Sequence, residues 1–316
     1  MIGNFETLVL SGIFIAAGLA TLLHIQFGLT GIVNFGIVGF WGLGIYGVGV
    51  LTIEYEIPFL IAVVLITLIT AVVALVLGWF ILELDSQAIL VSTLAFATIV
   101  YQLIENATGI TQGAKGLGTI RFPYKIERDS ALAEAGFTTQ FTYLLIIVAI
   151  VALLVWYARR MRGQPFGRLL VAISGNERLA RSLGKPTLRH KLIVFTITSS
   201  MMAFLGAVQG PVQQFLTPAL VLPTLTFTVW IGLVLGGKGH WAGGILGVVI
   251  LGVTFQILID YLDLPREWVK FMQQFEYVVY GALLVVLIML RPSGLLGTYH
   301  PKPPKIDAPP NTEAPR

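Results

Sequence analysis

The sequence predicts an all-α, polytopic membrane protein with about nine transmembrane helices (eight to ten), and three observations support this fold class. Only 11% of its 316 residues are charged, whereas soluble domains carry roughly a quarter. Hydrophobic residues make up 56% of the chain, and its mean hydropathy is +0.86. The apolar runs are long and continuous, which is typical of spanning helices and not of the short alternating strands of a barrel.

The first half of the chain predicts four spans, at residues 7–23, 25–53, 57–82 and 86–104. The second of these is unusually rich in glycine. The first run follows the acidic Glu6 rather than a basic segment, so we expect a retained span and not a signal peptide. A polar, glycine-containing loop at 105–138 follows the fourth span.

The second half predicts five spans, at 135–158, at two places within 192–237, at 239–259 and at 278–290. The stretch 192–237 contains no Lys, Arg, Asp or Glu and is too long for one span. Pro211, Pro218 and Pro223 predict a break near 217–223. Residues 1–300 then form one transmembrane domain, and the proline-rich residues 301–316 predict a disordered tail.

Positive charge is concentrated in residues 159–191, here called the basic loop. It holds nine Lys or Arg residues and a single acid, Glu177. Trp156 and Tyr157 precede it, as expected where a helix leaves the bilayer on the cytoplasmic side. The basic loop and the C-terminal tail are therefore expected in the cytoplasm, and the N-terminus and the loop at 105–138 outside.

Several kinds of site have no basis in the sequence. Cysteine is absent, the four histidines are scattered, and no nucleophile–base pair lies within a span, so we expect no catalytic residues and no metal site. No nucleotide-binding GxxxxGK[ST] motif occurs. No charged residue lies in the middle of a span, whereas ion-coupled carriers usually place ionisable groups there. These absences favour a transport pathway whose driving energy does not come from this chain itself.

Within the basic loop, the stretch NERLARSLG predicts a short amphipathic helix. Leu179, Ala180 and Leu183 are expected on one face of it. Gly175 precedes this helix, and Gly184 with the following Lys–Pro ends it. Such a helix could insert into a groove of a soluble partner or rest on lipid headgroups, and spacing alone leaves both alternatives open.

Four blocks of the sequence, in order, resemble the permeases of ABC transporters for branched-chain amino acids. They are GLTGIVNFGIVGFWGLGIYG, STLAFATIVYQLIENATGITQGAKGL, PFGRLLVAISGNERLARSLG and WIGLVLGGKGHWAGGILGVVILG, and the ending LRPSGLLG also resembles that family's C-terminus. The basic loop resembles the segment that docks into the ATPase subunit. Ala180 and Gly184 have the family's spacing, while Glu177 lies one residue further from the glycine than in importers generally. The pattern is closer to the M-type permease than to its H-type partner.

The resemblance implies a permease subunit of the prokaryotic plasma (inner) membrane that imports branched-chain or other neutral amino acids. It implies four kinds of partner: a second homologous H-type permease, two cytoplasmic ATPase subunits, an extracytoplasmic amino-acid-binding protein and membrane lipid. ATP would be bound by the ATPase subunits, so no cofactor is expected in this chain. The residues expected to couple to the ATPase are Gly175, Glu177, Arg178, Leu179, Ala180, Leu183 and Gly184.

Candidate substrate-pathway residues are the polar and small residues within the spans: Asn34, Gly36, Thr93, Thr98 and Gln102. A helix broken within 25–40 would offer backbone N–H and C=O groups to a zwitterionic substrate. Ordinary interhelical packing and hydrogen bonding is the alternative for each of these residues. Two other functions also stay open: the same machine importing urea or short amides, and a stand-alone channel or secondary carrier.

Overall fold

The computed structural model of the protein describes residues 4–124, 138–213 and 215–262, with residues 278, 282, 285–286, 289 and 294–297. Most of the span expected at 278–290 and all of the tail expected at 301–316 lie outside these residues. The regular secondary structure of the described part is helical, apart from an isolated antiparallel bridge between Leu117 and Leu216.

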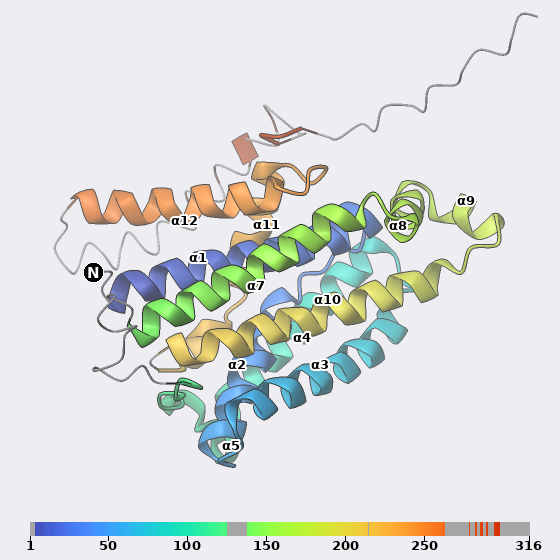
Figure 1. The fold of residues 1–316 in the computed structure, drawn as a ribbon. Coiled ribbons are helices and arrows are strands. Elements are labelled where there is room, and N and C mark those ends of the chain that lie inside the picture. The colour runs from blue at the N-terminus through green and yellow to red at the C-terminus, as the bar shows by residue number, and fades with distance from the viewer. Residues whose placement is uncertain are drawn as a thin grey trace, which may run out of the picture.

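The long helices are α1 (Asn4–Leu23), α2 (Ile37–Ile53), α3 (Phe59–Ile81), α4 (Ser86–Asn106), α7 (Thr139–Met161), α10 (Thr187–Gln209), α11 (Thr224–Gly236) and α12 (Gly243–Leu262) (Figure 1). Short helices are α5 (Thr108–Thr111), α8 (Pro165–Gly175) and α9 (Glu177–Ser182), with single turns η2 (Gly113–Lys115), η3 (Gly210–Val212) and η4 (Pro218–Val221). Six helical segments of the described part are long and apolar enough to cross a membrane. The all-helical fold class is confirmed, while the count of nine spans and their orientation stay predictions.

The boundary predicted between the first two spans, at His24, is wrong. The first helix continues through His24 as a wider π-helical turn, η1 (His24–Leu29), so the apolar segment runs from Glu6 to Leu29. The chain leaves the helix only at Gly31, whose φ of +76° lies in the left-handed region that glycine adopts at little cost. A buried histidine does not end a helix, but a left-handed backbone does. Residues 31–36, here called the unwound segment, then lead into α2.

The break predicted near 217–223 is confirmed. After α10 and the turn η3, the chain continues to η4 and then to α11, with Pro211, Pro218 and Pro223 in or beside these turns. A proline removes the backbone N–H that a continuing helix needs, and its ring clashes with the preceding turn. Leu216 exchanges two backbone hydrogen bonds with Leu117, at 2.9 and 3.0 Å, which ties this non-helical stretch to the segment after η2.

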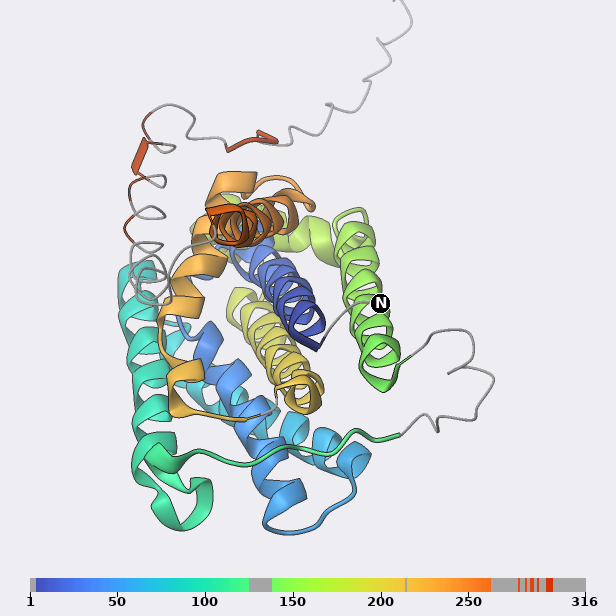
Figure 2. The ribbon, with the colours of Figure 1, turned by 90° about the vertical axis from the view of Figure 1, so that its left-hand side faces the viewer.

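The first helix, α2 and α10 form the centre of the bundle, and the other long helices lie around them (Figure 2). In the most apolar windows of Glu6–Leu29 and Thr187–Val212, 67% of the residues are buried, compared with 28% in α3, α4 and α7. The outer surface of α3 exposes Leu60, Leu68, Val72, Trp79 and Phe80. Exposed apolar side chains around a buried core are what a helix bundle in lipid requires.

Glycines set the closest helix contacts. A Cβ at Gly44 would overlap the backbone of Ala203 in α10, and one at Gly206 would overlap the carbonyl of Trp41 in α2. The pairs Gly232/Gly247 and Gly236/Gly243 bring α11 equally close to α12. Lipid removes most of the hydrophobic drive for helix association, so this backbone-to-backbone packing stabilises the bundle.

Candidate functional site

The basic loop folds as two short helices, α8 and α9, at the end of the bundle opposite α5 (Figure 1). The sequence predicted α9 but not α8. Pro165 occupies the first turn of α8, where its missing N–H costs nothing. Asn176, with an extended backbone, separates the two helices, and its side chain accepts a hydrogen bond from Leu179 N at 3.0 Å as the N-cap of α9.

Only two of the three apolar residues expected on one face of α9 share that face. Leu179 is 56% exposed and Leu183 is 71% exposed, whereas Ala180 is only 6% exposed. Adjacent helical positions point about 100° apart, so Ala180 turns to the protein interior while the leucines, four residues apart, both face outward. Gly184 ends α9 with φ of +76°, and Lys185 N donates to Ala180 O across it.

Glu177 is the acidic partner of two basic residues of the loop. Its carboxylate pairs with Lys191 and, at 3.2 Å, with Arg181 one turn further along α9. Burial alone would raise the pKa of this carboxyl group, but the hydrogen bond and charge of Lys191, with Thr187 and Arg181, lower the pKa below its usual value. Glu177 is therefore charged at neutral pH and ties α9 to the start of α10, while Arg178 remains exposed.

The inner face of α8 packs on the turn that leads into the unwound segment. Leu170 of α8 is fully buried in a cluster with Ile25 and Leu29 of η1 and with Ala158, Met161 and Val194. Gly31 also lies against this helix, because a Cβ there would be 3.1 Å from Ser174 Oγ. The basic loop and the unwound segment are thus in direct contact.

Side chains from three other parts of the bundle hydrogen-bond the unwound segment. Thr93 of α4 accepts from Phe35 N at 2.9 Å, and Trp230 of α11 donates to Asn34 O at 2.9 Å. The Asn34 side chain accepts from Gly36 N at 2.7 Å and donates to Gln26 Oε1 at 2.9 Å. Three backbone groups at the helix break, Phe35 N, Gly36 N and Asn34 O, are therefore satisfied inside the bundle, as polar groups must be at membrane depth.

Gln26 connects this segment to α10. Its amide nitrogen donates to Thr198 Oγ1 at 2.6 Å and to Ser199 Oγ at 3.2 Å. Neither Gln26 nor Trp230 was expected from the sequence. A polar side chain beside a glycine-rich stretch is the signal that could have identified Gln26. Nothing in the sequence could have placed Trp230, whose partner is a backbone carbonyl 196 residues away.

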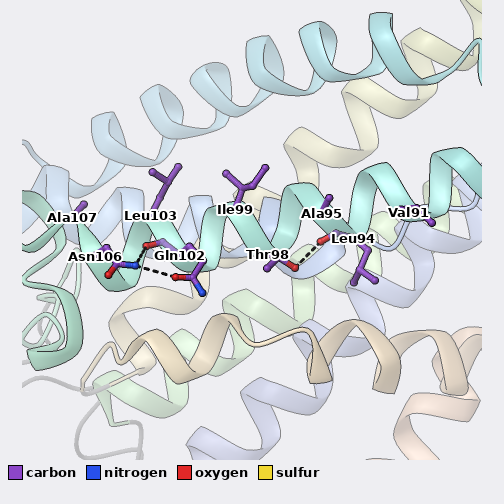
Figure 3. A pocket seen from close by; sticks show the side chains of 9 residues that line it. All are labelled: Val91, Leu94, Ala95, Thr98, Ile99, Gln102, Leu103, Asn106 and Ala107. Carbon is purple, nitrogen blue, oxygen red and sulfur yellow. Dashed lines mark hydrogen bonds between the residues drawn. The ribbon is translucent and has the colours of Figure 1, made fainter.

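The candidate pathway residues fall into two groups. Asn34, Gly36 and Thr93 meet at the unwound segment. Thr98 and Gln102 lie instead on the outer surface of α4, where they line an open groove of about 750 Å³ (Figure 3). The residues lining this α4 groove are Val91, Leu94, Ala95, Thr98, Ile99, Gln102, Leu103, Asn106 and Ala107. Asn106 donates to the Gln102 side chain at 3.0 Å, which makes a polar stripe on an apolar surface.

Within the described ranges, no group of three or more His, Cys, Asp or Glu residues is placed to hold a metal ion. The polar residues at the unwound segment are amides, hydroxyls and an indole. They can orient a neutral or zwitterionic group by hydrogen bonds, and they include no nucleophile–base pair.

Comparison with known proteins gives the same assignment along most of the chain. Residues 4–288 match the family described as the permease component of the branched-chain amino acid transport system. The chain is 28% identical to the high-affinity branched-chain amino acid permease LivM of Salmonella typhimurium, covering 95% of this chain and 71% of that protein. LivM of Escherichia coli is 27% identical with the same coverage. The permease LivH of Salmonella typhimurium is 26% identical, and the match covers 61% of this chain and 60% of LivH.

The match extends through the interrupted first helices, the basic loop and the glycine-packed α11 and α12, so the architecture and the family agree over the same residues. Members of this family are transport permeases and not enzymes. The chain belongs to the branched-chain amino acid permease family, as a multi-pass permease subunit of an ABC importer of the prokaryotic inner membrane.

Proposed function

We propose that this chain is the M-type permease of an importer for branched-chain or other neutral amino acids, and that separate ATPase subunits drive it. In this proposal it pairs with an H-type permease, receives substrate from an extracytoplasmic binding protein and carries no cofactor of its own. The observation that carries the proposal is the pair of exposed leucines on α9, Leu179 and Leu183, in a loop that is otherwise basic.

Several features of α9 suit it to dock on a soluble partner. Two large apolar side chains project from a helix whose backbone is capped at both ends. Gly175 and Gly184 flank the helix, and a Cβ added at either glycine would meet no heavy atom within 4 Å, so the surface around α9 is open. Exposed Arg178 adds charge beside the leucines. An apolar anchor with a charged rim is the usual make-up of a protein interface.

The contacts of α8 suggest how movement of α9 would reach the pathway. A displacement of α8 presses on Ile25 and Leu29 of η1 through Leu170, because packed side chains transmit strain with little compression. The unwound segment begins two residues after η1. We propose that ATPase closure shifts α8 and η1 together and exchanges the hydrogen bonds around Asn34 for contacts with substrate.

The α4 groove is the second part of the proposed pathway. Thr98, Gln102 and Asn106 form its polar stripe, and the remaining lining residues are apolar. An apolar surface with a few polar groups suits a neutral amino acid. The paired H-type permease would cover this open groove, so that substrate passes between the two permeases.

Charged substitutions in α9 test the docking role. Leu179→Asp with Leu183→Asp should abolish both co-purification of the ATPase subunits and ATP-dependent leucine uptake. Because both leucines are exposed, the chain itself should still fold, as judged by its elution as a single species in detergent. Ser182→Asp is the matched control, because it adds a carboxylate to the same helix without removing an apolar contact. Wild-type uptake by the double variant would contradict the proposal.

Competition experiments test the cargo. Uptake of labelled leucine by the complete complex should be inhibited by excess valine, isoleucine or alanine and unaffected by urea. Arabinose is a useful further competitor, since an arabinose permease of Escherichia coli, AraH, is 28% identical over 67% of this chain. Inhibition by urea or arabinose alone would reassign the cargo and leave the docking role intact.

A further inference from the structure

A cleft rich in arginine lies where α7 ends, between the start of α8 and the loop that joins α11 to α12. It encloses about 700 Å³ and is lined by Arg159, Arg162, Gly163, Arg168, Val171, His240 and Trp241, here called the arginine cleft. No acidic residue is among these lining residues.

The cleft is organised by specific contacts. Arg159 lies over the Trp241 ring, with its guanidinium carbon 5.1 Å from the ring centroid. Arg162 donates to the carbonyl of Gly239, which joins the α7 side of the cleft to the loop before α12. Ala242 N donates to His240 Nδ1 at 3.2 Å, which fixes the orientation of the imidazole ring and leaves Nε2 as its other polar atom.

The backbone adds to the positive potential of the cleft. α8 is an eleven-residue helix that begins at Pro165, between the lining residues Gly163 and Arg168. The N-terminus of a helix carries a partial positive charge. The exposed guanidinium groups of Arg159 and Arg168 beside it make a site for an anion, and planar guanidinium groups suit the oxygens of a phosphate.

Apolar surface extends from the cleft along both neighbouring helices. On α7, Leu153 and Trp156 are exposed, and Trp156 lies one turn before Arg159. On α12, Leu246 and Ile250 are exposed, one turn apart. Both helices pack against α1 (Figure 2). A ligand that is anionic at one end and apolar along the rest of its length fits the arginine cleft together with these apolar surfaces.

We propose that the arginine cleft binds the phosphate of an anionic phospholipid, whose acyl chains lie against the apolar surfaces of α7 and α12. Tryptophan beside arginine at the end of a spanning helix is typical of the headgroup level of a bilayer. Basic pockets between transmembrane helices bind such headgroups. The proposal rests on the geometry of the cleft and not on the proposed cargo or on the docking role of α9.

Lipid retention measured by native mass spectrometry tests the assignment. The purified chain, released from mixed micelles with equal amounts of phosphatidylglycerol and phosphatidylcholine, should retain phosphatidylglycerol preferentially. Arg159→Gln with Arg168→Gln should weaken that retention roughly thirtyfold, because each arginine at a membrane surface strengthens the binding of an anionic lipid about fivefold. Both residues are exposed, so neither substitution opens a cavity.

Two further variants separate the outcomes. Arg189→Gln removes an exposed charge outside the cleft and should leave retention unchanged. Arg159→Lys with Arg168→Lys keeps the charges but loses the planar forks, and should retain lipid at an intermediate level. Equal retention of the two lipids, or no loss in the double glutamine variant, would overturn the proposal. Displacement of the lipid by millimolar inorganic phosphate with no lipid preference would overturn the lipid assignment and identify a site for free phosphate.

Discussion

At the scale of single residues, Glu177 links charge to the shape of the basic loop. Its pKa is lowered in the folded chain, so the carboxylate stabilises the fold when the pH is above the ordinary value of about 4.5. That contribution is lost as the pH falls through the lowered pKa. A partly exposed pair of this kind contributes at most about 1 kcal/mol. The effect is therefore expected in α9 and not in the bundle as a whole.

Hydrogen exchange can detect this local effect. Amides of residues 177–185, corrected for intrinsic rates, should lose protection as the pH is lowered from neutrality through the lowered pKa of Glu177, while those of α10 should not. Glu177→Gln should remove most of the pH dependence, because its amide side chain does not titrate. Unchanged protection of the wild-type segment after acidification would contradict the role given to the Glu177 carboxylate.

Asn34 supports a second prediction at this scale. Asn34→Ala removes the acceptor of Gly36 N and the donor to Gln26, and it leaves both groups unpaired in a buried site. Each such group costs about 1–3 kcal/mol. The midpoint of thermal unfolding in detergent should fall by several degrees. Thr67→Val is the control, because Thr67 bonds to the Val63 carbonyl of its own helix, and it should leave the midpoint nearly unchanged.

Sequence patterns identified some site residues and missed others for a clear physical reason. Asn34 and Thr93 stand out because a polar residue in an apolar span needs a partner. Their actual partners depend on which helices are neighbours, and the sequence does not contain that information. Ala180 was expected on the same face of α9 as Leu179 and Leu183, and its burial away from them was missed for a related reason. Without the position of the bundle, the exposed and buried faces of a short helix cannot be distinguished.

At the scale of elements, α2 and α10 pack so closely that a single added methyl group should separate them. Gly206→Ala places its Cβ on the carbonyl of Trp41, and this atom belongs to backbone that cannot rotate away. We expect a loss of about 1–3 kcal/mol or more, as for other overpacked cores, and a clearly lower yield of folded protein.

Gly12→Ala is the matched control for this packing, since nothing lies within 4 Å of a Cβ there. It should be neutral or slightly stabilising in α1, because alanine favours the helix. Equal midpoints of thermal unfolding for the two variants would contradict the close contact between α2 and α10.

The two interruptions of the helices differ in how well the sequence predicts them. Three prolines mark the break before α11, because proline cannot continue a helix whatever surrounds it. The break after η1 depends on Gly31, one glycine among many in the stretch 25–53. Gly39, Gly44 and Gly47 lie within α2, where they serve packing and do not end the helix. A local signal cannot distinguish these two uses of glycine.

At the scale of the whole molecule, the basic loop lies at one end of the bundle, and α5 lies at the other together with the start of α1 (Figure 1). This relative placement agrees with the predicted topology, in which an odd number of spans separates the two ends. The composition predicts the all-helical class, and the distribution of charge predicts which segments share an end. Neither predicts that α1, α2 and α10 occupy the centre, since the apolar character of a span does not say which helices surround it: α3 has the highest hydropathy of the spans and yet lies at the surface.

The absence of cysteine allows a direct test of which end faces the cytoplasm. A single cysteine introduced at Ser182 in α9 or at Thr108 in α5 is exposed and is the only thiol in the chain. A membrane-impermeant maleimide added to intact spheroplasts should label Thr108→Cys and not Ser182→Cys, and inverted vesicles should give the opposite result. Positive charge resists transfer across the membrane, which is why the arginines of the basic loop predict this orientation. Labelling of Ser182→Cys from outside would place α9 beyond the reach of any cytoplasmic ATPase, and the docking proposal would then fail together with the predicted topology.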